Sequence, residues 1–514
     1  MIKCIILNRF ADQSRFGKEY FMNRTKKIIA VVLCMIFLIQ QLFLLTGAVA
    51  ANGGEPDFEI ESPYDIIDWD TWGTYKFQPH CHTNASDGFP TIHEFVQRHY
   101  DLDYDVVALT DHGTLNQGWN KQPQLVPIIR LVKYERSKLA PIIPLTEKEY
   151  NAVLNGTAPS ETRTHKNGML DVPKGVELNM ATPFADCHLT GYFCDYGQAL
   201  AGVFGDYETP SAGVRDAGGI SMLSHVGEYV YTKKDSEKYV CQKVDDYYAR
   251  KFARVFMDSP GSCVGMGINS ATDAHTRCDR ILYDQILQKT IPNGVTPWAF
   301  CFADSHSLAT MNDAYTMLMM PEFDMDHVRQ AMVDGTAFAV SHYSNGYELN
   351  GMQEIPGYSD DLALFDDESY YYSNETPMVT NIKVDNENDT ISIEGENFNE
   401  ITWVSNGNVI RRESNIKDGT ATLDLHASDL LDDPSLFVRF YITGDYGICY
   451  SQPFTLHEAG KSFDKVRVPV TIDLPAVLRF VVTVLDDLIF KKSFAVWAFK
   501  FFALGYDMWG ILPN

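Results

Sequence analysis

Two histidines separated by one residue stand in the run His80-Cys81-His82, and Asp87 follows five residues later in a Ser-Asp-Gly sequence. Because side chains alternate along a strand, His80 and His82 project from the same face if this segment is extended. Both imidazoles can then reach one metal ion, and the Asp87 carboxylate offers an oxygen ligand from the loop beyond the strand. Cys81 should point away from the ion. The segment therefore predicts part of a metal site.

Short apolar runs in the same part of the chain predict buried strands at residues 106–109, 175–178, 220–223 and 298–302. Helical patterns separate these runs, which indicates an α/β fold with a largely parallel sheet. In such folds the carboxyl ends of the strands meet at one edge, and catalytic groups gather there. Four potential metal-binding residues stand at or near these ends, namely His112, Glu177, His225 and Asp304.

Between residues 74 and 341 the order of such residues resembles that of the polymerase and histidinol phosphatase (PHP) family of metallohydrolases. The family pattern is a strand-borne His-x-His with a following Asp or His, a Thr-Asp-His, a Gly-[Val/Ile]-Glu, two isolated histidines and a late Asp-x-His. The chain matches it in order at nine positions: His80, His82, Asp87, His112, Glu177, His188, His225, Asp304 and His306. Nine ordered matches are far more specific than any single short motif.

The resemblance implies that residues 74–345 form a distorted (β/α)7 barrel with two or three divalent ions of manganese, zinc or iron, all compatible with imidazole and carboxylate ligands. The first ion and the catalytic centre would be held by His80, His82, Glu177 and Asp304. The second ion would be held by His188, His225 and a bridging Glu177. The third would be held by Asp87, His112 and His306. Asp111 is the expected orienting partner of these ligands.

Such ions lower the pKa of water and neutralise charge on a phosphoryl oxygen, so the resemblance implies hydrolysis of a phosphate mono- or diester. One alternative is an amidohydrolase-like enzyme that cleaves a C–N bond, because related barrels reuse similar ligands. The carboxylated lysine typical of that class has no obvious candidate here. A second alternative is a surface protein that binds without catalysis and uses the barrel as a scaffold.

Two features near the predicted site leave its details open. Asp273-Ala274-His275 is a second Asp-x-His that could replace Asp304 and His306, although the apolar run before Asp304 resembles a final buried strand more closely. Arg277, with the nearby Arg280 and Asp284, could instead line a substrate pocket. A guanidinium matches two phosphate oxygens, so Arg277 is the predicted phosphate contact, with a surface salt bridge as the alternative. Residues 113–174 resemble an insertion, and a lid is one role for it.

The sequence after residue 345 predicts a linker, a second domain and an apolar tail. An acidic linker covers residues 357–376, and period-two alternation with turn signals over 378–457 predicts a small antiparallel β domain of the sandwich type. Residues 474–505 form a very apolar tail, predicted to be helical. The tail either packs on the body as a helix pair or lies in a membrane interface.

The N-terminus predicts export. Arg24, Lys26 and Lys27 precede an apolar run over 28–45 and the small residues 48–50, the order of a secretory signal. Residues 1–50 are therefore a signal peptide or an uncleaved membrane anchor, and in both cases the body is extracytoplasmic, either secreted or anchored at the cell surface. Disulfides are compatible with this compartment, and two cysteine pairs are close in sequence: Cys187 with Cys194, and Cys263 with Cys278.

The net charge of −26 over 514 residues argues against partners that reward basic patches. Long nucleic acid is the least favoured substrate, and a small phosphorylated compound is the expected one. Association with a membrane would depend on the N-terminal anchor or on the apolar tail rather than on surface charge.

Overall fold

The computed structural model describes residues 57–125, 141–178, 188–196, 207–229, 244–270, 279–342 and 375–469. They all belong to the second of two compact units, Asp57–Asn514. The predicted leader (1–50), the linker up to residue 374 and the apolar tail (474–505) lie outside the described residues. So do Arg277, the Asp273-Ala274-His275 sequence, Cys187 and Cys278. None of the described helices is long and apolar enough to cross a membrane.

Two sheets carry the N-terminal α/β part of the described chain. The larger sheet contains, in spatial order, β13 (Ala337–Ser341), β12 (Ala314–Met320), β2 (Gly73–Gln78), β3 (Val106–Val107) and β6 (Leu170–Asp171). The smaller sheet has the order β11 (Trp298–Phe302), β10 (Cys263–Ser270), β9 (Ile220–Leu223), β8 (Leu189–Tyr192) and β7 (Val176–Leu178). The α/β class is thus confirmed.

The expectation of a largely parallel sheet was only partly correct. β2, β3 and β6 run parallel, and so do β9, β10 and β11. β8 is antiparallel to both of its neighbours, and β12 is antiparallel to β2 and β13. β6 lies at the end of the predicted insertion and forms the edge of the larger sheet. The apolar runs predicted the strands because burial dictates them, but burial does not dictate strand direction.

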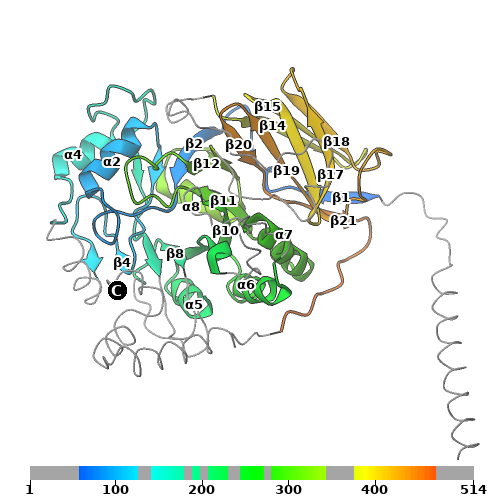
Figure 1. Cartoon of the computed structure of the whole chain (residues 1–514), viewed down its shortest axis with the longest axis horizontal. Coiled ribbons are helices and arrows are strands. Elements are labelled where there is room, and N and C mark those ends of the chain that lie inside the picture. The colour runs from blue at the N-terminus through cyan, green and yellow to red at the C-terminus, as the bar shows by residue number, and fades with distance from the viewer. Residues whose placement is uncertain are drawn as a thin grey trace, which may run out of the picture. The chain divides into compact units, whose positions relative to one another are not determined.

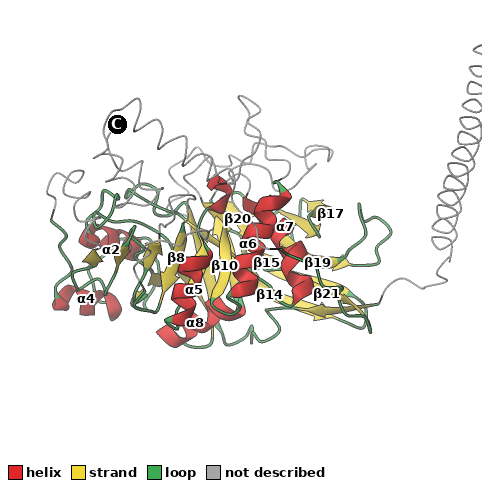
Figure 2. Cartoon of the chain, turned by 90° about the horizontal axis from the view of Figure 1, so that it is seen from below, coloured by secondary structure: helices red, strands yellow, loops and turns green. Residues whose placement is uncertain are grey.

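Helices connect most of these strands. They are α2 (Ile92–Asp101), α4 (Glu147–Leu154), α5 (Glu208–Asp216), α6 (Asp246–Asp258), α7 (Asp279–Thr290) and α8 (Met325–Asp334). In α6 the buried residues Ala249, Phe252, Ala253 and Phe256 recur at spacings of three and four, which places them on one face. Figures 1 and 2 show α5, α6 and α7 next to β8 and β10, where this face joins the core.

The two sheets meet through backbone hydrogen bonds beyond the strand ends. Beyond β3, the N–H of Gly113 donates to the carbonyl of Glu177 (2.8 Å) and the N–H of Glu177 donates to that of Asp111 (3.2 Å). Beyond β2 and β11, the N–H of Asp304 donates to the carbonyl of His80 (3.2 Å). No sheet of the described residues closes on itself, so the predicted barrel is not formed as one continuous ladder.

The strands expected in 378–457 are present and antiparallel. β14 (Met378–Asp385), β15 (Thr390–Glu396) and β18 (Thr420–Asp424) form a separate sheet. The larger sheet is joined by β16 (Glu400–Ser405), β17 (Asn408–Ser414), β19 (Leu436–Gly444), β20 (Gly447–Tyr450) and β21 (Phe454–Glu458). β20 pairs with β13, and β21 pairs with the N-terminal strand β1 (Phe58–Glu61). β20 and β21 and the strands that pair with them therefore continue the sheet that begins in the α/β part (Figure 1).

A buried ion pair also joins the two parts. Arg439 on β19 donates from Nε to Oδ1 of Asp284 on α7 (2.8 Å) and from Nη2 to Oδ2 (3.0 Å), and both side chains are 2 % exposed. Asp284 therefore holds the C-terminal strands rather than lining a substrate pocket, which corrects the expectation from its closeness to Arg277. Sequence separation concealed this contact, because the two residues are 155 positions apart.

A buried histidine in α2 should make the free energy of unfolding depend on pH in the acidic range. Burial lowers the pKa of His99 from 6.5 to about 3, whereas the carbonyl of Phe95 opposes the shift. Below pH 6.5 the unfolded chain therefore takes up a proton that the folded chain does not bind. We expect His99 to lower the free energy of unfolding by about 2 kcal/mol between pH 7 and pH 5, at about 1.4 kcal/mol per pH unit below 6.5.

Urea unfolding at pH 7 and pH 5 checks this. His99→Gln should reduce the loss of stability on acidification, whereas the same exchange at His93, which is about half exposed, should leave it unchanged. Equal losses in the wild type and in His99→Gln would contradict the prediction.

Candidate metal centre

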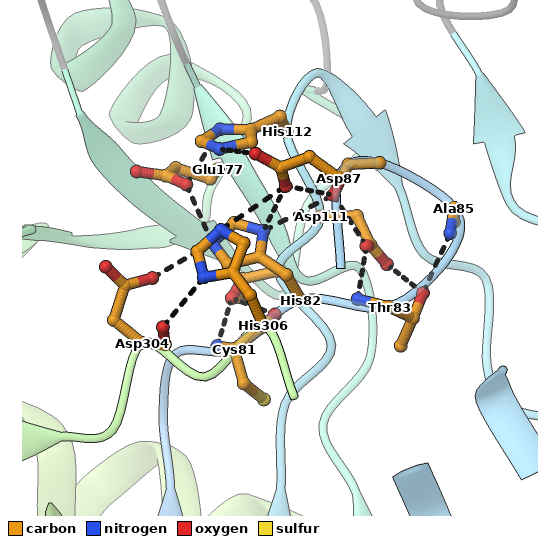
Figure 3. A network of polar contacts seen from close by, with 12 residues as sticks. Cys81, His82, Thr83, Ala85, Asp87, Asp111, His112, Glu177, Asp304 and His306 are labelled. Atoms are coloured by element: carbon orange, nitrogen blue, oxygen red, sulfur yellow. Dashed lines mark hydrogen bonds and ion pairs between the residues drawn. The ribbon is translucent and has the colours of Figure 1, made fainter. Parts of the chain in front are cut away.

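The structure brings all nine predicted ligands together at the junction of the two sheets. The nearest donor atoms form four groups within 4.8 Å: His82, Asp87, His112 and His306; His80, His82 and Asp304; His80, Glu177 and His225; and His112, Glu177 and His188. Most of these residues follow the carboxyl end of a strand, as expected, with Glu177 inside β7 and His188 just before β8. Figure 3 shows several of the side chains pointing toward one another.

The four residues of the predicted catalytic set are in mutual contact. Oδ1 of Asp304 lies 3.2 Å from Nε2 of His80 and 3.1 Å from Nε2 of His82. Oε2 of Glu177 lies 3.2 Å from Nε2 of His82 and 3.7 Å from Nε2 of His80. Two imidazole nitrogens and two carboxylates thus face one point, from strands that belong to both sheets.

Glu177 connects this group to the others. Its Oε2 lies 2.9 Å from Nδ1 of His112, and its Oε1 lies 3.5 Å from Nε2 of His225 and contacts Nδ1 of His188. The carboxylate is completely buried. This central position is what a bridging ligand requires, and the resemblance gave Glu177 that role.

His82 joins the first group to the one around Asp87. Its Nε2 faces Asp304 and Glu177, whereas its Nδ1 lies 3.7 Å from Oδ1 of Asp87. The two oxygens of Asp87 lie 3.4 Å from Nε2 of His306 and 3.4 Å from Nε2 of His112. The structure therefore adds His82 to the predicted set of Asp87, His112 and His306.

The electrostatics of the centre favour ionised carboxylates. Burial alone would raise the pKa of Glu177, but the imidazoles of His112, His188 and His80 hold it well below its usual range. Burial likewise opposes ionisation of Asp304, and His80 and His225 hold its pKa well below the usual range. These negative charges are concentrated in a site with little water, which is an arrangement that attracts cations.

The donor set fits divalent metal ions. Both oxygens of Glu177 and Nε2 of His80 are buried and form no hydrogen bond of good geometry within the described residues, although charged neighbours surround them. Buried polar atoms of this kind carry a large cost unless a partner satisfies them. Nitrogen and oxygen donors held close together are the ligands that manganese, zinc and iron accept.

Asp111 organises the loop that carries two of the ligands. Its carboxylate accepts hydrogen bonds from the N–H and the hydroxyl of Thr83 (2.7 and 2.9 Å) and from the hydroxyl of Ser86 (2.8 Å). Figure 3 shows the contacts of Asp111 with Thr83 near His82 and Asp87. Asp111 therefore orders the turn between the two ligands, which is the orienting role that we expected, exerted through the loop.

Thr110 was not singled out from the sequence. Its Oγ1 lies 2.7 Å from Nδ1 of His80 and accepts a hydrogen bond from the N–H of Cys81 (3.0 Å). This contact directs Nε2 of His80 toward Asp304. Thr110 belongs to the Thr-Asp-His motif, so its position beside Asp111 could have indicated a supporting role.

Two of the nine residues have unusual backbone conformations. The φ angle is 25° at His225 and 47° at Asp304, and positive values are uncommon outside glycine. Such conformations cost about 1–3 kcal/mol each and persist where surrounding contacts impose them, often at functional sites. The strain therefore falls on the segments that present ligands.

No protein-family model and no curated protein matches the chain. Several solved structures match the chain. One is a two-domain protein from Bacteroides vulgatus containing a predicted PHP-like metal-dependent phosphoesterase (16 % identity, 78 % of this chain and 100 % of that chain, TM-score 0.36). This chain is similar to a PHP-like protein.

Two further solved structures represent other chemistries. An amidohydrolase from Chromobacterium violaceum has 14 % identity, covering 45 % of this chain and 87 % of that one, with a TM-score of 0.25. A lesion-specific endonuclease from Pyrococcus furiosus has 10 % identity, covering 51 % and 56 %, with a TM-score of 0.27. Since all three TM-scores are below 0.5, the functional argument depends on the residues of the site.

Proposed function

We propose that the chain is an exported metal-dependent phosphoesterase of the PHP type, which hydrolyses a mono- or diester of a small phosphorylated compound. The observation that carries this proposal is the convergence of six imidazoles and three carboxylates in one largely buried centre. The two linked sheets would then be a distorted form of the (β/α)7 barrel, and the C-terminal strands a sandwich-like addition. The N-terminal basic, apolar and small segments support export.

The groups that hold the ions would be the nine residues of the centre. Divalent ions bound there would polarise a phosphoryl oxygen and supply a hydroxide nucleophile near neutral pH. His80, His82 and Glu177 have fully buried side chains, so they exclude bulk water from the inner part of the centre. The His306 side chain is 35 % exposed and that of Asp87 18 %, which makes their side of the centre the approach for substrate.

Phosphate esters suit this centre better than neutral amides do. The chain carries a net charge of −26, so an anionic substrate would be repelled unless cations neutralised it locally. A centre able to hold several divalent ions provides that neutralisation, and two ions also stabilise both the attacking and the leaving oxygen of a phosphoryl transfer. Hydrolysis of a C–N bond remains the second candidate, because the same ligands can polarise a carbonyl.

The test compares hydrolysis of p-nitrophenyl phosphate, bis(p-nitrophenyl) phosphate and a p-nitroanilide by the purified protein with added Mn²⁺ or Zn²⁺. We expect turnover of at least one phosphate ester and its loss on chelation. His80→Gln should abolish it, and His93→Gln, at a histidine that is about half exposed, should not. Turnover of the anilide alone would favour the amidohydrolase. No turnover by a folded, metal-loaded protein would favour a binding role.

A further inference from the structure

A glutamine two residues before the first ligand holds the segment that carries two others. The side chain of Gln78, at the end of β2, is fully buried. Its Oε1 accepts a hydrogen bond from the N–H of Ala303 (3.2 Å). Its Nε2 donates to the carbonyls of Met311 (3.3 Å) and Ala314 (3.2 Å). One amide therefore fastens both ends of a segment that leaves β11 at Ala303 and returns at Ala314.

This segment contains Asp304 and His306. Asp304 follows Ala303 directly and adopts a φ of 47°, so the direction of its side chain depends on how the neighbouring backbone is held. The carbonyl of Asp304 also contacts Nδ1 of His306 (3.0 Å), which couples the two ligands. A shift of Ala303 would consequently move both ligands relative to His80 and His82, which follow the end of β2.

The strand arrangement explains why a side chain, rather than the backbone of a neighbouring strand, binds Ala303. β11 pairs with β10 but not with β12 on its other side. Along that side, polar side chains replace the backbone ladder at every second residue. The amide of Gln452 binds both backbone groups of Ala299 (2.7 and 2.9 Å), the hydroxyl of Thr316 binds those of Cys301 (3.3 and 2.9 Å), and Gln78 binds Ala303.

We propose that Gln78 is a positioning residue of the metal centre, which sets the Asp304 carboxylate against His80 and His82. It acts through the backbone of Ala303 and does not itself bind metal or substrate. Gln452 performs the equivalent bridging at the opposite end of β11, away from the ligands, and therefore has a structural role alone. This inference rests on the proposed metal-dependent function.

The test replaces each glutamine with methionine, which has a similar size and forms none of these hydrogen bonds. Binding of Mn²⁺ is measured by calorimetry, and the Co²⁺-loaded protein is examined by its visible absorption spectrum. We expect Gln78→Met to weaken metal binding by roughly 10- to 100-fold, as loss of outer partners of ligands does, and to change the Co²⁺ spectrum. Gln452→Met should lower the urea midpoint and leave affinity and spectrum unchanged.

Gln78→Glu provides a second variant if methionine prevents folding, because it keeps the acceptor for Ala303. It loses the bonds that Nε2 donates to Met311, to Ala314 and to the hydroxyl of Tyr104 (3.4 Å). It should show a smaller change in the same direction. The proposal is overturned if a folded Gln78 variant has wild-type affinity and spectrum, or if Gln452→Met causes an equal loss. A wild-type protein that binds neither Mn²⁺ nor Co²⁺ would instead refute the proposed function, so the two failures are distinguishable.

Discussion

Replacing Glu177 with glutamine is expected to reduce kcat/KM for the proposed phosphate-ester substrate by roughly 1,000-fold. Metal-ion catalysis contributes several kcal/mol of charge stabilisation, and each 1.36 kcal/mol corresponds to a factor of ten in rate. Within the part of the chain that the structure describes, Glu177 is the one residue that approaches His82, His112, His188 and His225. Its loss would therefore weaken the two groups that contain it, and it would remove a contact with His82 in the group of His80, His82 and Asp304. Steady-state kinetics together with the metal content of the purified variant measure the effect.

A control substitution tests whether loss of any carboxylate that pairs with an imidazole, rather than loss of Glu177 itself, causes the effect. Glu149 is about half exposed, and its carboxylate lies 3.5 Å from Nε2 of His93, so it also pairs with an imidazole. Glu149→Gln should retain wild-type kinetics. A Glu177→Gln variant that retained more than about a tenth of the activity and the full metal content would show that Glu177 is not a bridging ligand.

Removing the buried partner of Asp284 is expected to produce the largest loss of stability. Arg439→Met should lower the free energy of unfolding by about 3–5 kcal/mol, because a carboxylate is left in the interior without its cation. Both side chains of the pair are 2 % exposed, and two hydrogen bonds of 2.8 and 3.0 Å join them. Urea unfolding at pH 7 provides the measurement, and Asp284→Leu combined with Arg439→Met should recover most of the loss.

The exposed pair of Arg250 and Asp246 in α6 is the control. Its side chains are 36 % and 49 % exposed, so Arg250→Met should cost less than about 1 kcal/mol. Equal effects of Arg250→Met and Arg439→Met would show that burial does not determine the cost of losing an ion pair in this fold. Failure of the double substitution to recover stability would indicate that Arg439 contributes mainly through packing of its side chain.

The sequence predicted which residues converge at the centre. It predicted less well how these residues are distributed among the groups of donor atoms. The resemblance to the PHP pattern supplied all nine residues of the centre. Four of them were also expected together from strand ends, since the carboxyl ends of neighbouring strands lie at one edge. The position of His82 between two groups depends on the tertiary structure, in which its Nε2 faces Asp304 and Glu177 and its Nδ1 faces Asp87. Spacing along the chain does not encode that arrangement. Gln78 was missed for a related reason, because a buried amide acquires its role only when the ends of a distant loop surround it.

For the fold, periodicity predicted strands and helices but not how sheets join. The alternation in 378–457 indicated antiparallel strands correctly. The merging of these strands with the α/β part through β13 and β20 is a matter of pairing partners, and local patterns contain no information on partners. The antiparallel direction of β8 and the pairing of Asp284 with Arg439 are hidden for the same reason.

The pairing of β1 with β21 has a consequence for the order of folding. Phe58 lies opposite Glu458, so the edge of the largest sheet forms between segments separated by about 400 residues. A ribosome has to synthesise almost all of the described chain before this ladder can form, and contacts so distant in sequence slow folding. Late completion of the sheet would suit the export proposed above, because a chain without its final strand pairing is still able to cross a membrane unfolded.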